Sequence, residues 1–175
     1  MFSYSKDIRS KGYEDLESAV KDIVEYRGKH LEEKEMKEIY RAQVENKEYI
    51  YLKEPESVTE LEFFRQDDLY YYSGSKVLTY VGVGSNDSYT ITETVRKDIA
   101  NTMWRGVGSE KGKAPAWGVS DDEQIFSVTI NDKEVDNIIP IDKNNGKNYY
   151  FWIMLNADGI GTIDDVKEIK IEVKK

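Results

Sequence analysis

Residues 149–155 read YYFWIML, seven consecutive aromatic or apolar residues between turn signals at 144–146 and 156–159. Such a run is too short for a membrane-spanning helix, which needs about 20 residues, and it favours a β-strand. Successive side chains of a strand point to opposite faces, so Phe151 and Trp152 face opposite ways. Because both faces are apolar, both must be covered, and the pattern predicts a central strand.

The composition is that of one soluble globular domain rather than a disordered or membrane-spanning chain. The 175 residues are 39 % hydrophobic and 34 % charged, and no repeat or low-complexity linker divides them. We therefore expect a single domain over residues 1–175, with two subdomains separated near residue 86 or 118 as the alternative. The net charge of −9, without any basic run, argues against a nucleic acid as partner.

The cellular compartment is left open by the sequence. It contains no cysteine, which suits the cytosol and the exterior of a Gram-positive cell equally. The N-terminus has no apolar signal core, so either the protein is cytosolic or a targeting segment precedes the given residues. We expect residues 1–14 to form a flexible segment next to such an anchor.

The clearest helix is predicted over residues 15–27, where apolar residues recur at helical spacing: Leu16, Val20, Ile23 and Val24. Asp15 is a suitable N-cap, and Gly28 follows the last turn. We expect this amphipathic helix to pack on a predominantly antiparallel sheet or sandwich, which gives an α+β fold. A helix that binds a partner or a membrane surface is the alternative.

Alternating patterns predict seven to nine strands in all. Hairpins are expected at 40–53, turning at Asn46 and Lys47, and at 60–74, turning at 66–68. Further strands are expected at 76–83, 88–95, 124–131, 134–141 and 166–173, and a turn at Asn131 and Asp132. A short helix from residue 92 is the alternative to the strand at 88–95. Residues 101–118 carry four of the chain's 12 glycines and show neither period, so they predict a long loop.

The segments AWGVSDDEQIFSVTINDKEV and YYFWIML resemble the C-terminal part of small membrane-anchored or lipoprotein ectodomains of Gram-positive bacteria. The matched positions are Gly118, Asp122, Glu123, Ile125, Val128, Asn131 and Trp152. The segment DLESAVKDIV is similar to the helix that opens those ectodomains after their anchor. The turn here has Asp132 where such proteins often have glycine, and no lipobox cysteine is present. The resemblance implies a location more than a function, since no enzymatic activity is established for such proteins.

Side chains suited to catalysis are sparse. The single histidine, His30, lies in a charged stretch, which leaves almost no material for a triad or a histidine metal site. Gly82 and Gly84 lack the third glycine of a dinucleotide fingerprint. The acidic clusters consist of residues adjacent in sequence and are interpreted as turns or caps; they lie at 67–68, 121–123 and 164–165.

Residues 156–168 match a calcium loop only in part. Asn156 and Asp158 fit the first two ligand positions, but Ile160 and Lys167 stand where two further ligands are needed. We therefore expect a plain turn in this segment. No metal and no cofactor are expected for the protein.

Two stretches are candidates for binding. The tyrosine row at 70–72 could bind carbohydrate or protein, although cross-strand pairing is the favoured interpretation. The loop 101–118 contains tryptophan and arginine, the residue types most enriched in binding hot spots. Its proposed binding residues are Met103, Trp104, Arg105, Lys111 and Lys113. The alternative, a position in the core, is favoured for Trp117 and equally weighted for Trp104.

We therefore expect a non-catalytic ectodomain, membrane-anchored or secreted, that binds another protein at the cell envelope. Contact with the membrane would be made only through an anchor outside the given residues. The alternatives are a carboxylate-dependent hydrolase acting on glycans and a cytosolic protein of mobile-element or phage origin. Two acidic residues facing each other across a closed cleft would favour the hydrolase. The partner and the oligomeric state stay open.

Overall fold

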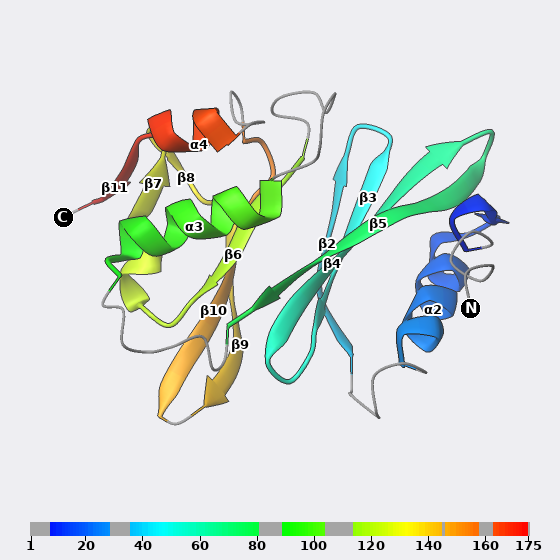
Figure 1. Cartoon of the computed structure of the whole chain (residues 1–175), viewed down its shortest axis with the longest axis horizontal. Helices are drawn as coiled ribbons and strands as arrows, with labels where there is room; N and C mark the ends of the chain where they lie inside the picture. The colour runs from blue at the N-terminus through cyan, green and yellow to red at the C-terminus, as the bar shows by residue number, and fades with distance from the viewer. Residues whose placement is uncertain are drawn as a thin grey trace. The chain divides into compact units, whose positions relative to one another are not determined.

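The structure, a computed structural model, describes residues 8–28, 36–80, 89–103, 114–144, 146–157 and 163–174. It has the predicted mixture of helices and predominantly antiparallel sheet. The chain divides into two compact units, Met1–Val77 (unit 1) and Leu78–Lys175 (unit 2) (Figure 1). The boundary lies nearer to residue 86 than to residue 118. Folding as a single domain stays a prediction.

Unit 1 contains a five-stranded sheet and the helix α2 (Leu16–Gly28). The strand order in the sheet is β1-β5-β4-β3-β2, and the last strand in the chain, β5, runs just past the unit boundary. The strands are β1 (Gly12–Tyr13), β2 (Lys37–Val44), β3 (Lys47–Lys53), β4 (Ser57–Gln66) and β5 (Leu69–Thr79).

Both predicted hairpins are present in unit 1, as β2–β3 and β4–β5 (Figure 1). The first turns at Glu45 and Asn46, one residue earlier than predicted, because Val44 pairs with Lys47. The second turns at Asp67 and Asp68, whose φ angles of 51° and 61° are those of a type I′ turn. Separate strands were predicted at 69–74 and 76–83. This was wrong up to residue 79, since residues 69–79 form the single strand β5 and the backbone stays extended through Gly74.

The tyrosine row lies across from other strands of the same sheet. Tyr70 pairs with Tyr13, and the rings of Tyr71 and Phe64 stack with centroids 5.3 Å apart. Tyr72 contacts Phe63 at 5.7 Å. The cross-strand interpretation of these tyrosines is therefore confirmed.

The core of unit 1 combines buried side chains of α2, β3 and β4 in one cluster. Its buried members are Ile8, Tyr13, Ala19, Val20, Ile23, Ile50, Leu52, Leu61 and Phe63. Asp15 caps α2 as predicted, since its carboxylate accepts a hydrogen bond from the Ser18 backbone N–H at 2.7 Å. The helix itself is found over nearly the predicted residues.

Part of the segment 1–14, for which we expected flexibility, belongs to this core. Ile8 and Tyr13 are 8 % and 6 % exposed, and β1 pairs with β5. The Tyr13 hydroxyl donates to Asp22 of α2 at 2.6 Å, which ties the segment to the helix that follows. Residues 1–7 lie outside the described residues.

Unit 2 contains two three-stranded sheets, with strand orders β6-β10-β9 and β11-β7-β8. Its strands are β6 (Ala116–Ser120), β7 (Val128–Ile130), β8 (Lys133–Glu134), β9 (Asn137–Asn144), β10 (Lys147–Met154) and β11 (Ile171–Val173). Its described helices are α3 (Ile91–Met103), the 3-10 helix η1 (Glu123–Ser127) and α4 (Ile163–Glu168). The expected total of seven to nine strands is not confirmed, since the described residues of both units form eleven.

The strand β10 is central in its sheet, as the stretch YYFWIML predicts. It pairs with β6 on one side and β9 on the other. Phe151, Trp152 and Ile153 are all 0 % exposed, so both of its faces are buried. Trp152 shares a core cluster with residues of α3, including Ile99, and the ring of Phe151 contacts that of Trp117 at 6.0 Å.

The strand predicted at 88–95 was wrong, and the helical alternative is confirmed as α3. Thr90 and Glu93 form a capping box: the Glu93 carboxylate accepts from the Thr90 backbone N–H at 2.7 Å, and the Thr90 hydroxyl accepts from the Glu93 N–H at 3.3 Å. Ile91, Val95 and Ile99 recur every four residues and are buried. The alternation of threonines concealed this helical period.

The long loop predicted at 101–118 was wrong at both ends. Residues 101–103 continue α3, and 116–118 belong to β6, which pairs with β10. The short strand β6 was missed because Ala116, Trp117 and Gly118 show no alternation of polar and apolar residues. Residues 104–113, the middle of the predicted loop, lie outside the described residues.

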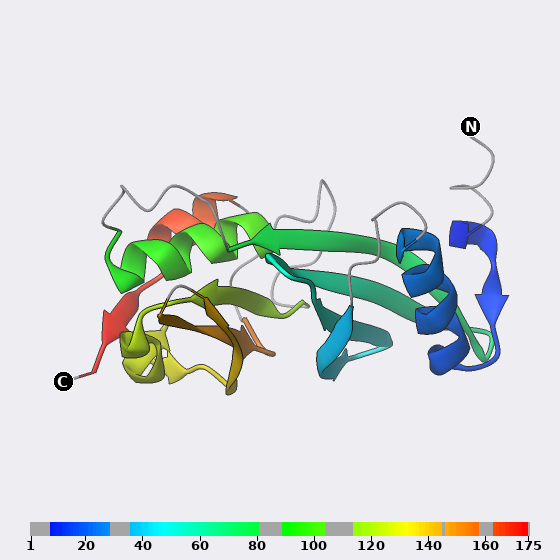
Figure 2. The same ribbon diagram turned by 90° about the horizontal axis from the view of Figure 1, so that it is seen from below.

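Two C-terminal strands are shorter than predicted. Residues 124–127 belong to η1, so Phe126 is 57 % exposed and only 128–130 form β7. Residues 166–168 belong to α4, which lies against α3 (Figures 1 and 2). The guanidinium of Arg96 in α3 donates to the carbonyl oxygens of Val166, Lys167 and Ile169, and these bonds satisfy the C-terminal end of α4.

Candidate binding site at two hairpin turns

Of the five binding residues proposed from the sequence, the structure describes only Met103. Met103 is the last residue of α3. Trp104, Arg105, Lys111 and Lys113 lie outside the described residues. Trp117 is 0 % exposed on β6, which confirms the favoured interpretation that it belongs to the core.

The interpretation of the acidic clusters as turns and caps is confirmed at 67–68 and 121–123 and was wrong at 164–165. Asp67 and Asp68 form the β4–β5 turn. Asp122 is the N-cap of η1, since its side chain accepts from the Gln124 backbone N–H at 2.8 Å. The pair at 164–165 instead belongs to the helix α4, because the chain there is helical rather than a turn. Asn131 and Asp132 form the predicted turn, with φ angles of 50° and 64°.

Other residues considered from the sequence lie outside the described residues: His30, Gly82, Gly84 and 158–162. The segment 156–168, which was compared with calcium loops, ends in α4. The strand predicted at 166–173 was therefore wrong at 166–168. Within the described part of the chain, no group of three or more histidine or acidic side chains could hold a metal ion. The helices described there include none that is both long and apolar enough to cross a membrane.

A polar cavity of about 450 Å³ lies at the turns of the two hairpins of unit 1. Both turns lie at the same end of the sheet (Figure 1), because the antiparallel pairing of β3 and β4 places Lys47 opposite Phe64. We call this cavity the turn pocket. It is lined by Gln43, Asn46, Glu48, Arg65, Gln66, Asp67, Asp68 and Tyr70.

Several contacts fix the shape of the turn pocket. The Arg65 backbone N–H donates to the Asn46 carbonyl oxygen at 2.9 Å, which joins one turn to the neighbouring strand. The Arg65 guanidinium pairs with Asp68 at 3.1 Å and lies 5.7 Å from the centre of the Tyr70 ring. Tyr70 in turn packs against the core of unit 1. The two-residue turns and this anchored ring give the pocket a preorganised wall.

The turn pocket carries an excess of negative charge, with the carboxylates of Glu48, Asp67 and Asp68 against the one guanidinium of Arg65. Partial burial raises the pKa of Glu48, and the nearby charge of Arg41 opposes this shift. Neither Glu48 nor Asp67 makes a side-chain hydrogen bond or ion pair with the residues that the structure describes. Their carboxylates can therefore accept hydrogen bonds from a ligand.

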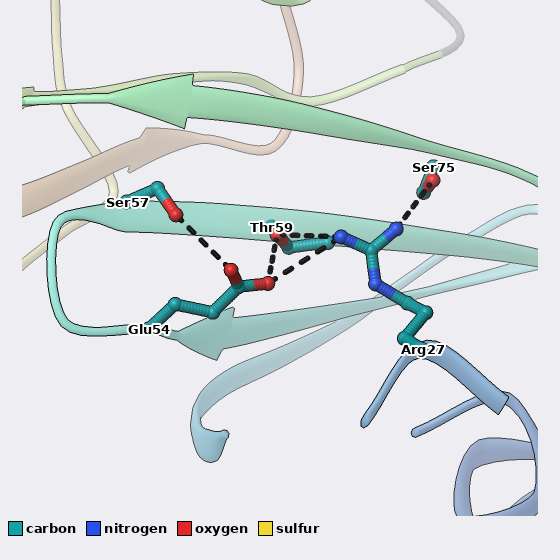
Figure 3. Close-up of polar contacts among 5 residues, drawn as sticks. All are labelled: Arg27, Glu54, Ser57, Thr59 and Ser75. Carbon is teal, nitrogen blue, oxygen red and sulfur yellow. Dashed lines mark hydrogen bonds and ion pairs between the residues drawn. The ribbon is translucent and has the colours of Figure 1, made fainter. Parts of the chain in front are cut away.

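A second polar cluster in unit 1 lies inside the protein and has a structural role. Arg27, in the last turn of α2, reaches Glu54 and Thr59 at 3.4 Å and Ser75 at 3.1 Å (Figure 3). Glu54 also accepts hydrogen bonds from Thr59 at 2.7 Å and Ser57 at 3.3 Å. A buried ion pair needs such additional bonds to offset its desolvation. With its carboxylate satisfied in this way, Glu54 holds the end of α2 against the β3–β4 turn.

The most strongly perturbed carboxyl group described in unit 2 is that of Asp98 on α3, which is 6 % exposed. Burial raises its pKa from 3.8 to about 8, although the Val119 backbone N–H donates to it at 3.0 Å and lowers the pKa. The Trp152 indole N–H has a smaller effect in the same direction, without forming a well-aligned hydrogen bond. A Cβ added at Gly118 would lie 2.1 Å from an Asp98 oxygen, so Gly118 is what allows this close approach.

The sequence predicts Gln66, Asp67 and Asp68 only as turn residues and does not predict Gln43, Asn46 and Glu48 as their neighbours. A signal was present, because two consecutive hairpins in one antiparallel sheet must turn at the same end when their inner strands pair. The register of β3 against β4, however, depends on tertiary packing. Comparison of the chain with known protein families, curated proteins and solved structures finds no match.

Proposed function

We propose that this protein is a non-catalytic binding module whose partner is another protein at the cell envelope. The observation that supports this best is the turn pocket, a concave polar surface held by two short turns on a packed sheet. Binding sites are commonly placed on loops that a rigid scaffold positions. Because the wall is preorganised, a ligand would lose less free energy in ordering it on binding.

A fixed α2 is part of the same proposal. Ala19, Val20 and Ile23 belong to the core cluster of unit 1, which supports a helix that packs permanently on the sheet rather than one that binds a partner. Partner contact is then assigned to the hairpin turns and to the segment 104–113. For the latter, Trp104 and Arg105 remain the proposed contact residues.

The test fills the turn pocket without changing its charge. Gln66 is exposed at the end of β4, so the substitution Gln66→Trp places a bulky ring in the cavity at little cost in stability. The matched control is Gln124→Trp, at an exposed position of η1. Both variants and the parent protein would be used to capture proteins from cell envelopes, with quantitative mass spectrometry as the readout.

The expected result is a partner that the parent and the Gln124→Trp variant retain and the Gln66→Trp variant loses. Equal capture by all three would remove the turn pocket from the proposal. Trp104→Ala, assayed in the same way, separates the two surfaces, because loss of capture with an unchanged thermal melt would assign the contact to the segment 104–113. A large loss of stability would instead place Trp104 in the core.

One observation favours a second candidate, the glycan hydrolase. The turn pocket places Glu48, whose pKa burial raises, in the same cavity as Asp67 and Asp68, and glycosidases use a protonated and an ionised carboxyl group together. Glu48→Gln would then abolish release of reducing sugar from cell-wall glycan. The binding proposal expects no release above background by the parent protein.

A further inference from the structure

The turn pocket has a charge pattern that selects among ligands. Three carboxylates and one guanidinium line it, a net charge of −2 (1 − 3) when all are ionised. That guanidinium is already engaged, because Arg65 pairs with Asp68 at 3.1 Å and lies over the Tyr70 ring. The charges left for a ligand are therefore the carboxylates of Glu48 and Asp67.

The neutral lining is also suited to a hydrogen-bond donor. Gln43, Asn46 and Gln66 each carry a side-chain amide whose oxygen accepts hydrogen bonds. The Gln43 amide nitrogen already donates one hydrogen bond to the Glu45 carbonyl oxygen at 3.3 Å, and the Gln43 amide oxygen can accept one from a ligand. A lysine ammonium has three donors and an arginine guanidinium five, and neither has an acceptor.

An anionic ligand fits this lining poorly. It would face two carboxylates, and its only attractive charge in the pocket, Arg65, would have to leave Asp68 first. A metal ion is also disfavoured, because no three acidic or histidine side chains of the described residues are placed so that they could hold one. Partial burial of Glu48 also favours a cationic ligand, since a buried carboxylate gains more from a nearby cation than an exposed one does.

We propose that the turn pocket binds a lysine or arginine side chain of the partner protein, held between the carboxylates of Glu48 and Asp67. This inference rests on the proposed function, because it names the chemistry of the partner at the same site. The partner's basic side chain enters from solvent, and the side-chain amides of the pocket accept its remaining N–H groups. The strongly acidic protein attracts such a segment over longer distances as well, which increases the rate of encounter.

The test measures binding of a fluorescein-labelled lysine–glycine peptide by fluorescence anisotropy. The pocket variant is Glu48→Gln/Asp67→Asn, which keeps the shape of both side chains and removes two charges. The control is Glu14→Gln/Glu56→Gln, which removes two charges from exposed positions of unit 1 outside the pocket. The control matters because any acidic protein attracts a cationic peptide.

The expected result is binding that is about fivefold to tenfold weaker for the pocket variant, as two partly exposed ion pairs contribute, and unchanged within twofold for the control. A peptide with acetylated lysines should not bind, and an arginine–glycine peptide should. Equal loss in the two variants would mean general electrostatic attraction and would overturn the inference, as would full binding of the acetylated peptide.

The outcome is distinguishable from that of the proposed function. If Gln66→Trp abolishes partner capture while Glu48→Gln/Asp67→Asn preserves it, the pocket binds a protein but not through a basic side chain. If neither variant affects capture and the lysine peptide binds all variants equally, the turn pocket is removed from the proposed function and the inference fails with it.

Discussion

At the scale of single residues, Asp98 shows how one buried group links sequence, packing and pH. Its side chain reaches the strand β6 because Gly118 has no Cβ there, and the Val119 N–H is its hydrogen-bond donor. Burial is the largest cause of its raised pKa of about 8. A carboxyl group in this setting is protonated in the folded protein at a pH where it is ionised in the unfolded chain.

The stability of the protein should therefore fall as pH rises from about 4 to about 8. In this window the folded state holds the Asp98 proton and the unfolded state does not, so the free energy of unfolding decreases by up to about 1.4 kcal/mol per pH unit. Above pH 8 both states are ionised and the slope vanishes. Asp98→Asn should remove the slope, as measured by chemical denaturation between about pH 5 and 9.

The control for this experiment is Glu168→Gln, an exposed position at the end of α4. It should follow the parent profile. Parallel profiles for the parent and Asp98→Asn would show that Asp98 does not hold a proton in the folded protein across this range.

At the scale of elements, the sequence pattern predicts α2 clearly and α3 poorly. The residues of α2 show a plain apolar stripe, and its boundaries are predicted within a residue. In α3 the threonines at alternate positions suggest a strand, and the capping box of Thr90 and Glu93 is the signal for a helix. A helix of this kind is recognised from its start rather than from its composition.

Two positions on the apolar stripe of α2 predict different costs for acidic substitutions. Ile23 is 1 % exposed, so Ile23→Asp places an unpaired carboxylate in the core and should prevent the helix from packing. Leu16 is only partly buried in the first turn, where an aspartate also suits the helix dipole, so Leu16→Asp should cost less. Thermal melts and circular dichroism measure both. Two cooperatively melting, parent-like variants would show that α2 is available to a partner.

At the scale of the whole molecule, the two compact units pose the question of cooperativity. All three tryptophans, Trp104, Trp117 and Trp152, lie in unit 2, so tryptophan fluorescence reports the unfolding of that unit. The strands of unit 1 are followed instead by hydrogen exchange at residues such as Ile50 and Leu61. The two probes can thus be read independently.

Trp152→Ala should lower the free energy of unfolding of unit 2 by about 3–5 kcal/mol, because it removes a fully buried side chain from the central strand. The single-domain prediction requires exchange protection at Ile50 to fall together with it, and Phe63→Ala in unit 1 should in turn lower the fluorescence midpoint. Protection that changes only in the mutated unit would mean two independently folding units.

The sequence by itself determined the elements whose pattern is local. The run YYFWIML specifies a strand buried on both faces, the stripe from Leu16 to Val24 specifies a helix, and the acidic pair Asp67 and Asp68 specifies a turn. The strand and the helix follow from side-chain periodicity, and the turn follows from the backbone preference of its residues. The same kind of signal failed at β6, where Trp117 is buried by neighbours distant in sequence.

Only the tertiary structure decided which residues meet. The turn pocket exists because the register of β3 against β4 places two turns side by side, and register is set by the packing of a whole sheet face. The raised pKa of Asp98 likewise depends on α3 lying over Gly118, and no local sequence pattern predicts this contact. Local preferences act over a few residues of the chain, whereas burial and charge depend on segments brought together by the core. This is why the sequence did not show which residues line the site.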